Sequence, residues 1–262
     1  MYQSDNQKKF IKKLKKEKYT ILFFQITIVT SFIILWELLT YYEVINSFIY
    51  SSPSKIFLTL KTLFLTNNLF THIFTTLFEV LIAFVLGILL GFIISVIFYE
   101  HPLIAKIFDP FLTILNSLPK VALGPIIIII AGANTKSIII MALLINLIVS
   151  ITTIYNGFIN TDKTKIKMFT TFNASKKQIL YKLVIPSSYS TIISSLKLNI
   201  ALTLIGVITG EFLVSKKGIG YLIIYGTQVF NLDLVMAGIL LLLIISYILY
   251  KLVIKLEKKL LK

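Results

Sequence analysis

Polar side chains inside long apolar stretches are the residues of this sequence best suited to chemistry. Lys120, Lys197 and Glu211 each lie in such a stretch, and Asn116 precedes Lys120 by one helical turn. Ionisable groups within a membrane are costly and commonly mark a pathway or a gate. We therefore take these four residues as candidates for a pathway or gate. For Lys197 and Glu211, the alternative is a charge that extends along the helix to reach water.

The residues that catalysis or metal binding would need are scarce. The chain has no Cys and has two His residues, His72 and His101, which are too far apart in sequence to indicate a ligand cluster. The sequence shows no convergent set of His, Ser and acidic residues and no Gly-rich phosphate loop of the P-loop type. We predict that the chain is not an enzyme and carries no metal or cofactor of its own.

The composition indicates a membrane protein. Of 262 residues, 57% are hydrophobic and 14% are charged, whereas about a quarter of the residues of a soluble domain are charged. A helix needs about 20 apolar residues to cross the bilayer. We predict an all-α, polytopic fold with six spans, at about 20–41, 72–98, 106–132, 137–157, 187–212 and 232–254.

The net charge of +15 follows the predicted spans, so we attribute it to membrane topology and not to a nucleic-acid partner. With both termini inside, 19 Lys residues lie on inner segments and 5 on outer segments. The positive-inside rule then predicts that both termini are cytoplasmic, and the family resemblance described below implies the plasma membrane of a prokaryote. We expect the first span to be retained and not cleaved as a signal peptide.

Helix-breaking residues gather in the third predicted span, at Pro110, Pro119, Gly124 and Pro125. In a bilayer such residues are tolerated where neighbouring helices or a wet cavity satisfy the freed backbone groups. Two interpretations stay open at this point. The segment is a broken helix that faces a pathway, or it is a kink that serves packing.

Other polar and small residues in the spans are better explained by packing. Asn146 is expected to hydrogen-bond between helices, and Gly87 and Gly91 to permit close helix contact. Glu79 is expected to pair with a Lys. After the first span, Ser52 and Pro53 are expected to open an outer amphipathic helix, whose alternative interpretation is a simple connector.

The polar stretch 160–186 predicts a helical hairpin on the cytoplasmic side. Its first helix is expected from about Lys163 to Phe172, with Asn173 in the left-handed conformation after it. Ser175 is expected to cap the second helix, which should end before Pro186. We expect this amphipathic hairpin to contact a partner.

Residues 167–186 resemble the EAA loop of binding-protein-dependent ABC importer permeases, which reads Glu-Ala-Ala, then Gly-Ala-Ser, then a hydrophobic residue and Pro. The positions that fall on this pattern are Asn173, Ala174, Ser175, Ile185 and Pro186. Lys167, Met168 and Phe169 replace the Glu-Ala-Ala, which removes the acidic residue. The ordered segments 52–54, 76–77, 109–110, 118–119, 124–125, 210–222 and 233–239 resemble the nitrate, sulfonate and taurine branch of these permeases.

This resemblance implies a type I (MetI-like) permease fold in which two permease chains, expected to be a homodimer, form the pathway. Separate cytoplasmic ABC ATPases would bind ATP and Mg and grip the hairpins, and an extracytoplasmic binding protein would deliver the substrate. The implied coupling residues are Lys167, Phe172, Asn173, Ala174, Ser175, Ile185 and Pro186. We expect residues 1–71 to form the basic N-terminus, first span and outer segment, and residues 72–262 to form the core.

The expected substrate is a sulfonate, taurine, nitrate or a related anion, with a thiamine pyrimidine precursor or another vitamin-like molecule as the alternative. A secondary transporter working alone is a further alternative. It would predict inverted repeats and paired acids near the membrane midplane, and we identify neither in the sequence.

Overall fold

The computed structural model describes residues 5–66 and 68–260, and helices are the only regular elements in these residues. Two short turns of other helical types interrupt the α-helices: a 3-10 turn, η1 (Lys120–Leu123), and a π-helical turn, η2 (Leu180–Val184). The α-helices are α1 (Asp5–Tyr41), α2 (Ser47–Tyr50), α3 (Pro53–Leu65), α4 (Asn68–Glu100), α5 (Pro102–Ser117), α6 (Gly124–Ala131), α7 (Thr135–Ile159), α8 (Lys163–Thr171), α9 (Lys176–Ile179), α10 (Ile185–Ser187), α11 (Tyr189–Val214), α12 (Ile219–Gln228) and α13 (Leu232–Leu260).

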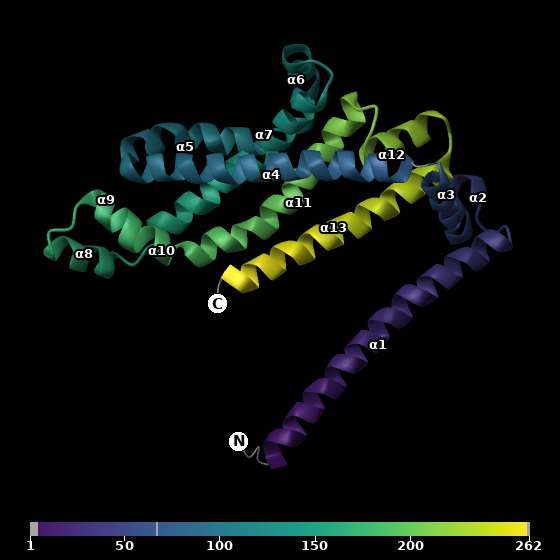
Figure 1. Cartoon of the computed structure of the whole chain (residues 1–262), viewed down its shortest axis with the longest axis horizontal. Coiled ribbons are helices and arrows are strands. Elements are labelled where there is room, and N and C mark those ends of the chain that lie inside the picture. The colour runs from purple at the N-terminus through teal and green to yellow at the C-terminus, as the bar shows by residue number, and fades with distance from the viewer. Residues whose placement is uncertain (1–4, 67, 261–262) are drawn as a thin grey trace.

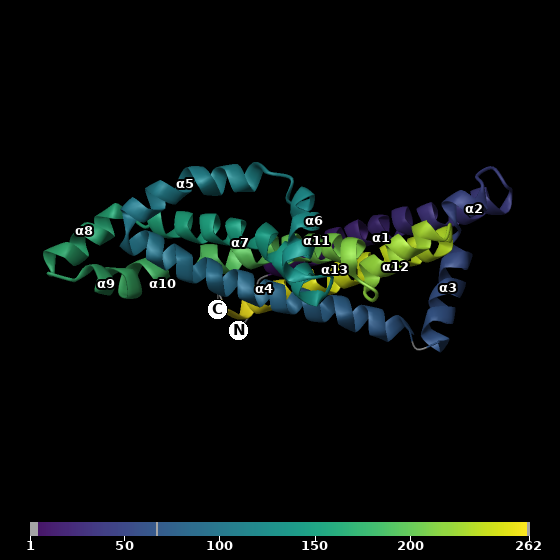
Figure 2. The same cartoon turned by 90° about the horizontal axis from the view of Figure 1, so that it is seen from above.

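The helices α4, α7 and α11 form the centre of the molecule, and α13 packs against α11 and α12. Figures 1 and 2 show that α8 and α9 lie at one end of this bundle, whereas α2, α3 and α12 lie at the other end. The helix α3 runs across the bundle and not along it (Figure 2). The helical hairpin and the α2, α3 and α12 end are therefore separated along the long axis.

Five helices of the described residues are long and apolar enough to cross a membrane, and a bent pair supplies a sixth candidate span. These elements confirm the predicted all-α fold and give five or six candidate spans, depending on whether the bent pair crosses as one. The third predicted span, 106–132, is not one continuous helix, because α5 and the segment Lys120–Ala131 meet at 93°. The break follows from Pro119, which holds Leu118 in an extended conformation with ψ 140°.

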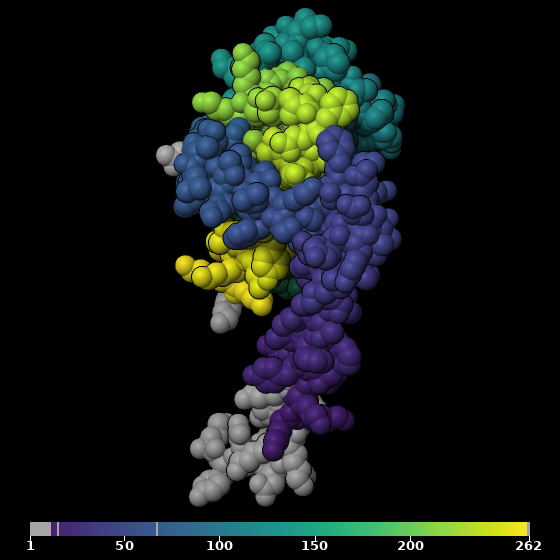
Figure 3. All heavy atoms as spheres, turned by 90° about the vertical axis from the view of Figure 1, so that its right-hand side faces the viewer, coloured from purple at the N-terminus to yellow at the C-terminus, as the bar shows by residue number. Residues whose placement is uncertain are grey.

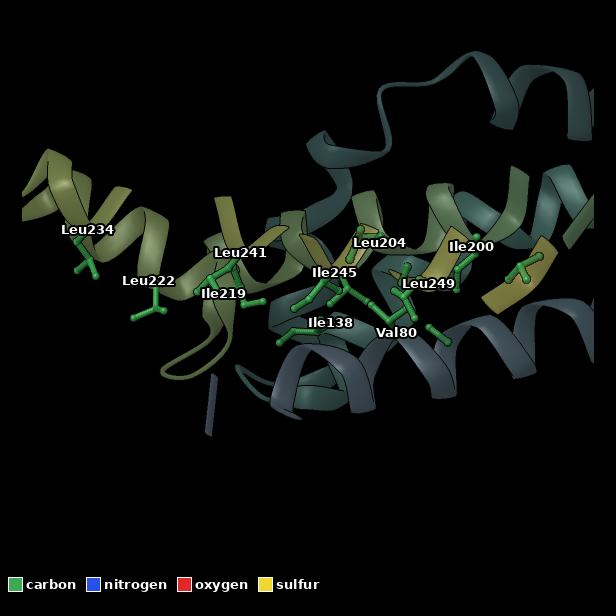
Figure 4. Packing of buried hydrophobic residues seen from close by; sticks show 14 residues of the cluster. Val80, Ile138, Ile200, Leu204, Ile219, Leu222, Leu234, Leu241, Ile245 and Leu249 are labelled. Carbon is green, nitrogen blue, oxygen red and sulfur yellow. The ribbon is translucent and has the colours of Figure 1, made fainter. Parts of the chain in front are cut away.

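The core is a chain of aliphatic side chains from α4, α7, α11, α12 and α13 (Figure 4). Glycines bring the central helices into contact: Gly206 lies against the backbone of Ala142, and Gly91 lies against Ser150. A Cβ at Gly87 would collide with the side chain of Asn146. The prediction that Gly87 and Gly91 serve close packing is confirmed.

The first span, α1, extends away from the bundle, as Figures 1 and 3 show. Its carboxylate Glu37 accepts hydrogen bonds from the backbone N–H and the Oγ of Ser54, at 3.0 and 2.8 Å. Ser52 caps α3 and Pro53 opens it, as predicted. The helix α12 was not predicted, and it lies between the fifth and sixth predicted spans, 187–212 and 232–254.

Candidate functional site

The hairpin between α7 and α11 has the local geometry that its sequence predicts. Asp162 caps α8 by accepting a hydrogen bond from the backbone N–H of Thr164 at 2.8 Å. That hydrogen bond lowers the pKa of the Asp162 carboxyl. Asn173 takes φ 56° after α8, and Ser175 forms a reciprocal capping box with Gln178 at the start of α9. These local interactions fix both ends of the turn.

The second helix of the hairpin does not end before Pro186, and that prediction is wrong. The chain passes through η2 and α10 into α11 with right-handed helical conformations at each junction. In η2 the backbone N–H of Ile185 bonds to the carbonyl of Leu180, five residues earlier. In a regular α-helix the Pro186 ring would clash with the carbonyl group four residues earlier. The wider π turn relieves this clash. The hairpin therefore continues directly into the fifth span.

The hairpin is fixed to the end of α7 by its apolar face. Ile154 and Phe158 of α7 pack with Leu180 and Val184, all of them buried. Ala174 and Ile185 are half-buried against the same cluster, whereas the other predicted coupling residues are exposed: Lys167, Phe172, Asn173, Ser175 and Pro186. The Phe172 side chain is 77% exposed. An apolar tip and six exposed Lys residues, at 163, 165, 167, 176, 177 and 182, thus face outward.

A polar cavity of about 380 Å³ lies beside the hairpin. Its lining combines the last turns of α7 with the start of the hairpin and of α11, including Asn156, Asn160, Lys165 and Thr191. This cavity was not predicted from the sequence. Its signal was the spacing of Thr153 and Asn156 in the last turns of α7 and of Asn160 at its C-cap, which places polar side chains on one side of this helix end.

Asn116 and Lys120 meet at the bend of the third span. The Lys120 Nζ donates to the Asn116 carbonyl at 3.0 Å and to its Oδ1 at 3.4 Å. The lysine thereby satisfies one of the free backbone carbonyl groups at the C-terminal end of α5. The Asn116 side chain is exposed and Lys120 is partly exposed. They remain accessible candidates for a pathway.

Lys197 has a carboxylate partner that the sequence did not identify. Its Nζ lies 2.9 Å from the Oε2 of Glu257 on α13, and the two side chains are 33% and 13% exposed. It is the only ion pair among the side chains that the structure describes, those of residues 12–14, 16–66 and 68–260. The Lys197 side chain extends toward the last turns of α13. Its ammonium group is paired there with a carboxylate and is not left to water alone.

Glu211 does not extend to water, and the interpretation as an interfacial charge is wrong. Its side chain is fully buried and accepts hydrogen bonds from Thr76 Oγ1 at 2.6 Å and from the backbone N–H of Gly220 at 2.5 Å. Thr76 Oγ1 in turn accepts from the N–H of Ile219 at 2.9 Å. Glu211 therefore joins α4, α11 and α12 inside the chain.

Glu79 has no Lys partner in the described part of the chain, so the prediction that it pairs with a lysine is wrong. It lies against Glu211 instead. His72 accepts a hydrogen bond from the N–H of Gly218 at 3.0 Å. Positions 72, 76 and 79 share one face of α4, and that spacing was the signal by which this cluster could have been found.

The fold and the hairpin define a class: a multi-span helical membrane protein with a basic helical hairpin between its fourth and fifth spans. Residues 83–262 match the family model described as "Binding-protein-dependent transport system inner membrane component". The chain belongs to this family of transport permeases.

Relatives and solved structures agree with that assignment. Over 66% of this chain and 69% of the relative, the sequence is 27% identical to the formylaminopyrimidine transport permease protein ThiX of Halalkalibacterium halodurans. It is 25% identical to the putative aliphatic sulfonates transport permease protein SsuC of Bacillus subtilis, over 88% of this chain and 83% of the relative. A probable ABC transporter permease protein of Haemophilus influenzae is 31% identical over 56% of this chain and 60% of the relative.

The fold is also that of a solved transporter subunit. A chain of the inward-facing MetNI methionine ABC transporter superposes with a TM-score of 0.64 at 14% identity. The superposition covers 75% of the present chain and 97% of that chain. The MetI-like fold expected from the sequence is thereby confirmed.

Proposed function

We propose that this chain is the pathway-forming subunit of an ATP-driven importer. Two copies would enclose the pathway, separate ATPase subunits would bind ATP and Mg on the cytoplasmic side, and a binding protein would deliver substrate from outside. The observation that carries the proposal is the α8–α9 hairpin, which exposes Phe172 at its tip and buries its other face against α7. An exposed amphipathic helix is a common means of docking into a groove on a partner.

The connection from the hairpin to the spans supports a mechanical role. Leu180 and Val184 are fully buried against Ile154 and Phe158, and helical backbone continues through Pro186 into α11. A displacement of the hairpin would therefore move α7 and α11 together. These two helices form a large part of the core, so ATPase closure would be passed to the spans.

The proposed orientation places the hairpin and both termini in the cytoplasm of a prokaryotic cell, with α3 and α12 outside. The Lys distribution supports it, because the hairpin alone exposes six lysines. Residues 1–71 would form a peripheral unit and residues 72–262 the transporting core. Asn116, Lys120 and the polar cavity beside Asn156 are proposed to contact the pathway.

For the substrate, we propose a small organic or inorganic anion such as a sulfonate, taurine or nitrate. The similarity to SsuC over 88% of the chain supports this class. The similarity to ThiX keeps a pyrimidine precursor as the second candidate. Substrate choice would rest on the separate binding protein that we propose to deliver it.

The experiment that tests the proposal is copurification of the tagged full-length chain from its own membranes with its associated subunits. An ATP-binding subunit should copurify with the unmodified chain, and Phe172→Ala should reduce its recovery several-fold. Phe57→Ala is the matched control, because Phe57 is 71% exposed at the opposite end of the molecule. Equal recovery with both variants would refute the hairpin as the docking site. Transport by the purified chain without any ATPase would support a secondary transporter instead.

A further inference from the structure

A second constellation lies at the end of the bundle opposite the hairpin, between α4, α11 and α12 (Figure 1). It contains two buried carboxyl groups, Glu79 and Glu211, which are 1% and 0% exposed. The family assignment gives neither of them a role. Their chemistry follows from the groups around them and does not depend on the proposed importer function.

The two carboxyl groups differ in their hydrogen bonds. Each oxygen of Glu211 has a donor, since Thr76 Oγ1 donates to Oε1 at 2.6 Å and the Gly220 N–H donates to Oε2 at 2.5 Å. Two donors favour an ionised carboxylate, which only accepts hydrogen bonds. The oxygens of Glu79, which lies against Glu211 and near Thr135, have no donor with hydrogen-bond geometry in the described residues.

Neither carboxyl group forms an ion pair with any residue whose side chain the structure describes. His72 on α4 accepts the Gly218 N–H at its Nδ1, and a nitrogen that accepts a hydrogen bond carries no proton. On α12, Tyr221 stacks on His72. Lys216 and Lys217 on the loop, and Lys136 on α7, are exposed.

We propose that Glu79 and Glu211 form a two-carboxyl site that binds one proton. The O–H of the Glu79 carboxylic acid donates to the Glu211 carboxylate, so the site carries one negative charge instead of two. This arrangement satisfies Glu79, which otherwise has no donor, and avoids two adjacent buried charges, which would repel each other strongly. Glu211 is the ionised partner because both of its oxygens already have donors.

The proton would hold the loop 215–218 against α4. Gly218 has φ 106°, and a Cβ there would collide with the Glu211 carboxylate. The backbone N–H groups of Gly218, Ile219 and Gly220 donate hydrogen bonds to His72, Thr76 and Glu211, respectively. When the proton leaves, the second negative charge on Glu79 repels Glu211 and weakens these contacts. The cavity of about 770 Å³ that Glu79, Thr135 and Lys217 line would then open further.

Infrared spectroscopy of the purified full-length chain at neutral pH tests the proton directly. The wild-type chain should show a carboxylic acid C=O band that is absent from Glu79→Gln and present in Glu37→Gln. Glu37 is the control, because its carboxylate has its own donors at Ser54. A wild-type spectrum without the band, or a band unchanged in Glu79→Gln, overturns the proposal.

Thiol labelling tests the effect on the loop, because the chain has no native Cys. Lys216→Cys reports on the loop and Lys136→Cys, on the exposed start of α7, corrects for the pH dependence of thiol reactivity. The ratio of the two labelling rates should rise several-fold from mildly acidic to alkaline pH, and should stay flat when Glu79→Gln is added. The same rise with Glu79→Gln overturns the proposal. A ratio set by the concentration of a monovalent cation at fixed pH also overturns it and assigns a cation site.

Discussion

The amide of Asn146 on α7 joins three helices, because its Nδ2 donates to Thr203 Oγ1 on α11 at 2.7 Å and to the Ala83 carbonyl on α4 at 3.0 Å. Gly87 leaves the space that the amide occupies. The expected interhelical role of Asn146 is therefore confirmed, and this contact lies at the middle of the bundle that would have to move during transport.

The first prediction concerns the strength of that contact. In a double-mutant cycle of Asn146→Ala and Thr203→Val, the coupling between the two residues should be about 0.6 kcal/mol and at most about 2 kcal/mol, as for other hydrogen bonds between membrane helices. Reversible unfolding in detergent measures it. Thr152→Val is the control, since its hydroxyl bonds only within α7. A coupling of zero would contradict the role.

The second prediction separates a structural from a transport role for Lys197. Because the Lys197–Glu257 pair is partly exposed, Lys197→Met and Glu257→Gln should each lower the unfolding free energy by about 1 kcal/mol or less. The exchange of the two charges, Lys197→Glu with Glu257→Lys, should recover part of the loss. If uptake falls with Lys197→Met but not with Glu257→Gln at equal stability, Lys197 contacts the substrate instead.

The third prediction concerns the turn of the hairpin. Asn173 has φ 56°, a conformation that costs a β-branched residue about 1–2 kcal/mol and glycine nothing. Asn173→Val should therefore increase hydrogen exchange in α8 and α9 and reduce recovery of the ATPase, whereas Asn173→Gly should preserve both. Thr170→Val in right-handed helix serves as the control. Equal behaviour of the Val and Gly variants would show that the turn is not conformationally restricted.

The fourth prediction is a pH dependence at the start of α8. The Thr164 N–H bond lowers the pKa of Asp162 in the folded chain, so the cap stabilises α8 above the ordinary carboxyl pKa and is lost as pH falls through the lowered value. Amide protection factors of α8 should decrease in that acidic range, and Asp162→Ala should remove the step. The Asn134 cap of α7, which accepts from Lys136 N–H at 2.8 Å, does not titrate and is the internal control. A similar decrease of the protection factors in α7 would mean that acid destabilises the whole fold and not this cap.

Local sequence determined much of this protein. The spans follow from runs of apolar residues, since a backbone in lipid has to satisfy its own hydrogen bonds and becomes helical. The hairpin followed from residues whose preferences act over three or four positions, such as Ser175 with Gln178 and the left-handed Asn173. The break after α5 followed from Pro119, although the sequence did not give its angle of 93°.

Tertiary structure alone decided the environments of the charged residues. The sequence indicated that Lys197, Glu79 and Glu211 lie in spans, but their partners, Glu257 for Lys197 and each other for the two glutamates, come from helices distant in sequence. Whether a carboxyl group in an apolar segment reaches water depends on which helices cover it, and Thr76 and Gly220 cover Glu211. The passage of helix through Pro186 likewise depended on a π turn that the buried cluster around Leu180 holds in place. Residue type and spacing therefore determined the helices, and long-range packing determined which polar groups meet.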